Sequence, residues 1–175
     1  EHGRAARMLG DSGAAGERIA THLLMTSPRG DAEVIELLRD AGHTAARQGA
    51  ADSAVAYFRR ALEEGPSDDI RPVLLFELGI VEALTAGPPA AEHLEEALTT
   101  LQDETARIIT AHVLVRVLVF MSRPADAARI AARFVDTLPP ELEDTRQGFE
   151  AFSYAMILFD AEPVERQSEL TERRT

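Results

Sequence analysis

The five histidines of this chain are its first candidates for metal or acid–base chemistry. None has the His-Glu-x-x-His spacing that places two ligands on one face of a helix. Asp40 and His43 lie three residues apart and could share a helical face, but a lone pair of this kind is most often a solvated surface pair. There is no cysteine to supply a thiolate ligand or nucleophile, so we expect neither a metal nor a cofactor. The histidines are His2, His22, His43, His93 and His112.

Glycines and paired carboxylates are two further patterns that could indicate chemistry. Gly10, Gly13 and Gly16 have a spacing seen in phosphate-binding loops, but no strand precedes them, which favours a plain turn between helices. Adjacent acidic residues could mimic catalytic carboxylates. Neighbours on a helix diverge by about 100°, however, so such pairs do not converge on one site. We therefore expect the chain not to be an enzyme. The pairs are Glu63-Glu64, Asp68-Asp69 and Glu95-Glu96.

The composition narrows the class of protein. The chain has 175 residues, 30 of them acidic and 18 basic, and every basic residue is an arginine; the formal net charge is -12. This length suits one compact domain or a short repeat array, and 45% hydrophobic residues can build a core. The negative charge argues against direct contact with nucleic acid. No apolar run approaches the roughly 18 residues of a membrane span, so we expect a cytoplasmic protein without membrane contact.

Helix-forming residues dominate, and breakers divide the chain into segments of helical length. Asp31 and Asp103 are candidate N-caps, and Pro124 suits the first turn of a helix. The apolar segment 113–120 is rich in β-branched residues, but it continues a helical pattern and has no partner strand, so we interpret it as a buried helix. We predict nine helices, near residues 2–10, 14–26, 31–48, 51–64, 69–86, 89–101, 103–121, 124–137 and 141–160.

An internal repeat of about 36 residues is the strongest pattern in the sequence. Residues 35–66 form one unit, in which small residues let two antiparallel helices approach and large residues fill the groove between them. In the next unit, Leu78-Gly79 matches Ala41-Gly42. Leu94 likewise matches Phe58. We predict that paired helices touch at small residues of this pattern, among them Ala41, Ala45, Ala54, Ala61, Ala90, Ala97 and Ala127.

Residues 35–66 resemble a tetratricopeptide repeat in their Leu–Ala/Gly–Ala first helix, their Gln-Gly turn and the pattern that ends at Pro66. The stretch 2–66 is similar to the region after the ATPase module in large ATP-binding regulators of the LuxR family. The similar segments are HGRAARML at 2–9, GERIATHLL at 16–24, VIELLRDA at 34–41 and AVAYFRRAL at 54–62.

This resemblance implies an all-α fold, a right-handed superhelix of antiparallel helical hairpins. It also implies a helical connector over residues 1–30, a repeat array over 31–160 and a polar tail or linker over 161–175. The ATPase and helix-turn-helix domains of that family would lie outside this chain, which has no lysine for a phosphate loop.

In such an array the first helix of each hairpin lines a concave face where ligands usually bind. Arginines and histidines there would suit a carboxylate or phosphate group on a protein or small-molecule effector. The alternative is that the polar residues are solvated and the apolar ones pack into the next repeat. The predicted face consists of Arg39, His43, Arg47, Phe76, Ile80, His112 and Arg116.

We therefore expect a non-catalytic signalling domain that binds an effector and couples it to the flanking domains of a LuxR-type regulator. One alternative is a freestanding tetratricopeptide-type adaptor unrelated to transcription, and an all-α enzyme has no supporting motif. The apolar stretch 149–159 is either a joint to a further repeat or a dimer interface, so a homo-oligomer is also open.

Overall fold

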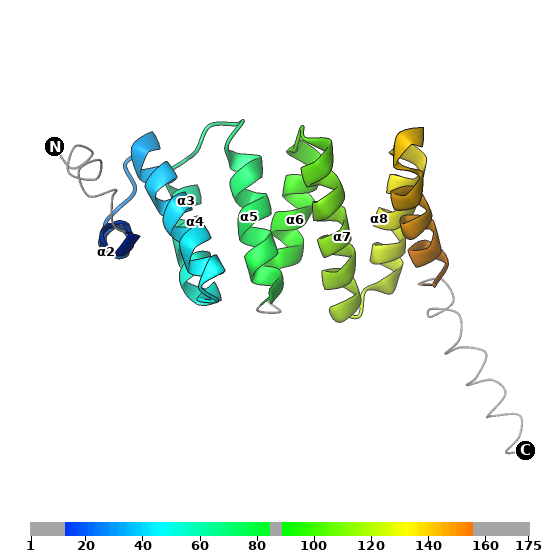
Figure 1. The fold of residues 1–175 in the computed structure, drawn as a ribbon, viewed down its shortest axis with the longest axis horizontal. Helices are drawn as coiled ribbons and strands as arrows, with labels where there is room; N and C mark the ends of the chain where they lie inside the picture. Colours follow the sequence, from blue (N-terminus) through cyan, green and yellow to red (C-terminus); the bar gives the residue numbers. More distant parts are fainter. Residues whose placement is uncertain (1–12, 85–88, 156–175) are drawn as a thin grey trace, which may run out of the picture. The chain divides into compact units, whose positions relative to one another are not determined.

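The computed structural model describes residues 13–84 and 89–155, and within these ranges the chain is all-α (Figure 1). The helices pack sequentially in adjacent pairs. The predicted helix at 2–10, the end of the last predicted helix and the predicted tail at 161–175 lie outside the described residues. The helices are α2 (Gly13–Leu23), α3 (Ala32–Arg47), α4 (Ala51–Glu63), α5 (Arg71–Leu84), α6 (Pro89–Thr100), α7 (Glu104–Phe120) and α8 (Pro124–Thr137), followed by the 3-10 turn η1 (Pro140–Leu142) and a helical segment over 143–155.

The chain divides into two compact units, residues 1–110 and 111–175. In the first unit, α3 pairs with α4 and α5 with α6, while α4 also packs against α5 and α2 against α3. The second unit holds the C-terminal part of α7, α8 and the segment 143–155. The β-branched segment 113–120 is helical, as predicted. The prediction that this helix is buried is wrong for Arg116, Val119 and Phe120, which are exposed.

The predicted helix boundaries rest on hydrogen bonds and backbone angles seen in the structure. Asp31 is the N-cap of α3, and its side chain accepts a hydrogen bond from the backbone N–H of Glu33 at 2.9 Å. Asp103 does the same for α7, because its carboxylate accepts from the N–H of Ala106 at 2.6 Å. Gly49 follows α3 with a φ of 77°, a left-handed value that side chains disfavour.

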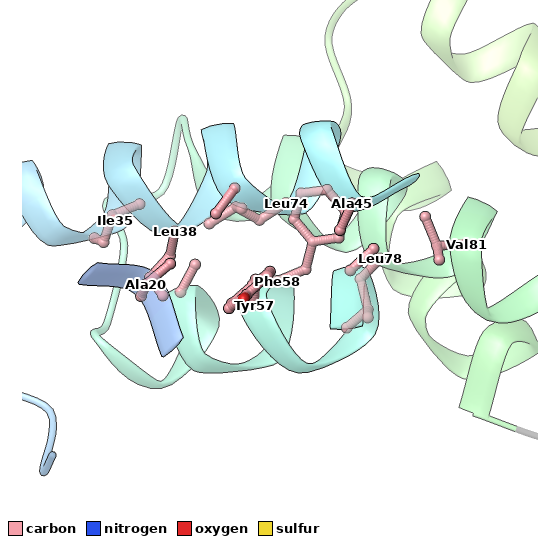
Figure 2. Close-up of a cluster of buried hydrophobic side chains, with 12 residues drawn as sticks. Ala20, Ile35, Leu38, Ala45, Tyr57, Phe58, Leu74, Leu78 and Val81 are labelled. Atoms are coloured by element: carbon pink, nitrogen blue, oxygen red, sulfur yellow. The ribbon is translucent and has the colours of Figure 1, made fainter. Parts of the chain in front are cut away.

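The core of the first unit lies between α2, α3, α4 and α5, where side chains from all four helices meet (Figure 2). Leu38, Phe58 and Leu78 are each almost completely buried there. In the second unit, the ring of Phe149 lies 5.1 Å from that of Phe134 and is itself buried. The seven alanines predicted at helix contacts are all buried as well.

The paired helices approach most closely at two glycines. A Cβ atom placed on Gly42 of α3 would lie 2.7 Å from the ring of Phe58 in α4. A Cβ atom on Gly79 of α5 would lie 2.6 Å from Cγ of Leu94 in α6. Real Cβ atoms essentially never approach other heavy atoms this closely, so any larger residue at either position would force the neighbouring side chain to shift. The match of Gly79 to Gly42 and of Leu94 to Phe58 is therefore confirmed in three dimensions.

We predict that Gly42→Ala lowers the free energy of unfolding by about 1–3 kcal/mol, because the added methyl group overpacks the contact with Phe58. Urea unfolding followed by circular dichroism would measure this. The matched control is Gly148→Ala in the segment 143–155, where a Cβ meets nothing within 4 Å and alanine should stabilise the helix by up to about 1 kcal/mol. Equal stabilisation by both substitutions would contradict the close approach.

Candidate functional site

Two residues of the predicted binding face, Arg39 and His43, contact a glutamate of the next hairpin. Arg39 of α3 donates to Glu77 of α5 through Nε, at 3.0 and 2.8 Å, and through Nη2 at 2.7 Å. His43 Nε2 lies 3.1 Å from Glu77 Oε1. The hydrogen bond to Glu77 raises the pKa of Arg39 above its usual value, although partial burial opposes this. Arg39 and His43 therefore join two hairpins instead of facing solvent as a free pair.

A second glutamate of α5 binds the other helix of each hairpin. Glu82 is buried, and its Oε1 accepts from Arg59 of α4, at 2.6 Å from Nη2 and 3.2 Å from Nε. Its Oε2 lies 2.7 Å from Nδ1 of His93 in α6. A buried carboxylate is stable only when it is paired and hydrogen-bonded. Glu82 of α5 thus contacts α4 of the preceding hairpin and α6 of its own hairpin.

A third carboxylate, that of Glu64, joins the end of α4 to the residues that precede α3. Glu64 is buried at the end of α4, and its Oε2 accepts from the backbone N–H groups of Arg29 and Gly30, each at 2.7 Å, and of Asp31 at 3.3 Å. Its Oε1 accepts from Arg60 Nη2 at 2.8 Å, and Arg60 Nε donates to the carbonyl of Leu23 at 3.3 Å. Burial acts to raise the pKa of Glu64, but these hydrogen bonds outweigh it and lower the pKa.

The other residues of the predicted face lie on three different helices. Arg47 is exposed at the end of α3, and its Nη2 donates to Thr44 Oγ1 at 3.0 Å. Phe76 and Ile80 of α5 are half-buried, and Phe76 packs against the cluster formed by Leu75, Ala97 and Leu101. His112 and Arg116 are exposed on α7, and the ring of His112 lies 4.2 Å from that of Phe149.

Sequence reasoning identified Arg39 and His43 but missed their carboxylate partner, Glu77, and the contacts of Glu82. After Arg71 at its start, α5 is apolar except for Glu77 and Glu82. That contrast was the available signal, because a carboxylate on a buried face needs a positive partner. Glu77 contacts Arg39 and His43, two of the three α3 residues in the predicted face. The exposed cations of the predicted face are Arg47 and Arg116.

Two features are absent from the described part of the chain: a cluster of metal ligands and a helix that could span a membrane. Across residues 13–84 and 89–155, no three His, Asp or Glu side chains gather as a set of metal ligands. No helix in these ranges is long and apolar enough to cross a membrane. Comparison of the chain with protein-family models, curated proteins and solved structures finds no match.

We predict that Glu82→Gln lowers the free energy of unfolding by about 1–2 kcal/mol, because the substitution leaves Arg59 and His93 without a carboxylate at a buried contact. The loss is smaller than for a fully buried pair because solvent screens the half-exposed Arg59. The control is Glu96→Gln, whose pair with Arg71 is exposed on both sides and should contribute less than about 0.5 kcal/mol. If chemical denaturation showed equal losses of unfolding free energy for the two variants, the stabilising role of Glu82 between the hairpins would be contradicted.

Glu64 should make stability depend on acid pH. Its pKa is lower in the folded chain than in the unfolded chain, so its contribution is fully present above the unfolded value of about 4.3 and is lost as pH falls through the folded pKa. We expect Glu64→Gln to reduce stability by about 2 kcal/mol at neutral pH and by much less near pH 3. Thermal melts of both proteins across this range provide the measurement, and a constant difference would contradict the assignment.

Proposed function

We propose that this chain is a non-catalytic helical-repeat interaction module, in which tetratricopeptide-like hairpins stack as a right-handed superhelix. One observation carries the proposal: the same contact of a glycine with a large side chain recurs in successive hairpins. Gly42 meets Phe58, and Gly79 meets Leu94, which is the repeat of about 36 residues expressed as packing. Each hairpin then buries its apolar face only against its neighbours.

The ion pairs made by the two glutamates of α5 support stacking of consecutive hairpins. Glu77 binds the first helix of the preceding hairpin, and Glu82 binds its second helix. Neighbouring hairpins are therefore joined along both layers of the proposed array. A ligand that prefers one arrangement of such hairpins would shift the population toward it. That shift is the means by which we propose that the module passes a signal to its flanking domains.

We further propose that the module belongs to an ATP-dependent regulator of the LuxR type, because residues 2–66 resemble the segment that follows the ATPase module of that family. The effector is a protein or a small molecule that binds the exposed face of the first helices. Since Glu77 pairs with Arg39 and contacts His43, recognition of a negative group would fall to Arg47 and Arg116. A freestanding adaptor would use the same packing and differ only in its flanking domains.

The coding sequence around this segment tests the link to transcription. We expect a phosphate-loop ATPase upstream and a helix-turn-helix domain downstream. A gene that encodes only helical repeats would instead support the freestanding adaptor.

A ligand screen tests the binding role itself. Compounds and peptides that carry carboxylate or phosphate groups would be added to the chain during thermal unfolding, because a ligand of the folded state raises the apparent stability. We expect the stabilising ligand to lose its effect on Arg116→Ala. The control is Arg133→Ala on α8, an exposed arginine outside the predicted face. If both substitutions act alike, the predicted face is not the binding face.

A further inference from the structure

The C-terminal half of α7 exposes large apolar side chains next to one another. Phe120 is 85% exposed, and its neighbours Val119 and Met121 are 38% and 37% exposed. Leu114 and Leu118, on the other side of the helix, are completely buried. A helix that is apolar all round is normally covered all round. The exposed side of α7 therefore has the apolar composition that is typical of an interaction surface.

This face, which we call the α7 face, consists of His112, Arg116, Val119 and Phe120. These residues recur at intervals of three and four, so they share one side of the helix. The ring of His112 packs beside the buried ring of Phe149, so the face borders the segment 143–155. Such a strip along two turns matches the width of an amphipathic helix laid against it.

The charge of the α7 face is unlike that of the rest of the protein. Residues 105–125 contain neither Asp nor Glu and are the longest such stretch in a chain with 30 acidic residues. Arg116 is exposed in the middle of the face, and it has no ion-pair partner in the described part of the chain. An unneutralised guanidinium framed by apolar side chains would attract one carboxylate carried on an apolar surface.

We propose that the α7 face docks an amphipathic helix of a protein partner, with apolar side chains against Val119 and Phe120 and a carboxylate against Arg116. This inference rests on the proposed function and names the class of effector. A second copy docked with its two-fold axis through the middle of this face would bring Arg116 against Arg116, which is repulsive. An anionic membrane is disfavoured by the net charge of -12.

The test is selection of helical peptides from a displayed random library against the full chain, with affinities then measured by fluorescence anisotropy. We expect selected peptides to carry Asp or Glu among apolar residues at helical spacing. Arg116→Glu should weaken their binding by about tenfold, and replacing the peptide's acidic residue by Lys should restore it. Phe120→Ala should weaken binding by about tenfold whatever the peptide's charge.

The matched control is Arg133→Glu, which makes the same change of charge at an exposed site on α8 and should alter affinity by less than about twofold. Unchanged thermal melts would show that each variant still folds. The inference is overturned if the selected peptides ignore Arg116→Glu and Phe120→Ala yet respond to Ile80→Ala, a result that would leave the proposed function standing.

Two other results would also overturn it: binding of anionic lipid vesicles, or dimerisation that Phe120→Ala abolishes. Failure to select any peptide, together with no stabilising small molecule, would count against the proposed function as well.

Discussion

The contact between Gly42 and Phe58 sets the distance between α3 and α4, and most of the first unit depends on that distance. With no Cβ on Gly42, the ring of Phe58 can lie directly on the backbone of α3. The ring then fills the space that Leu38 and Leu78 share, so that α5 can pack on the same cluster. A wider spacing would leave these side chains around voids, which protein interiors tolerate poorly.

Packing of this kind places the helices side by side, but apolar contacts alone allow some sliding between hairpins. The carboxylates of α5 restrict this sliding, because a bidentate pair such as that of Arg39 with Glu77 has a preferred geometry. Glu64 serves the same purpose at the end of the first hairpin, where it binds three consecutive backbone N–H groups. Polar groups here specify an arrangement whose stability comes mainly from burial.

Much of the fold could be read from the sequence, because helical periodicity and the placing of glycine and alanine are local properties. The pairing of α3 with α4, the cap at Asp31 and the helical state of 113–120 all followed from short-range patterns. The partners of Arg39 and His43 could not be read in this way. Whether an exposed-looking arginine meets a glutamate 38 positions later depends on how one hairpin is rotated against the next, and no local pattern encodes that rotation.

The two carboxylates of α5 have a mechanical consequence. Glu77 and Glu82 are five residues apart, so they project about 140° from one another around the helix and are separated by about 7.5 Å along it. One is held by α3, and the other by α4 and α6. Rolling α5 about its own axis would pull at least one of these attachments apart. These contacts therefore restrict rotation of α5 about its own axis. A movement of one hairpin against the other would have to keep α5 fixed relative to both, or break one of the ion pairs.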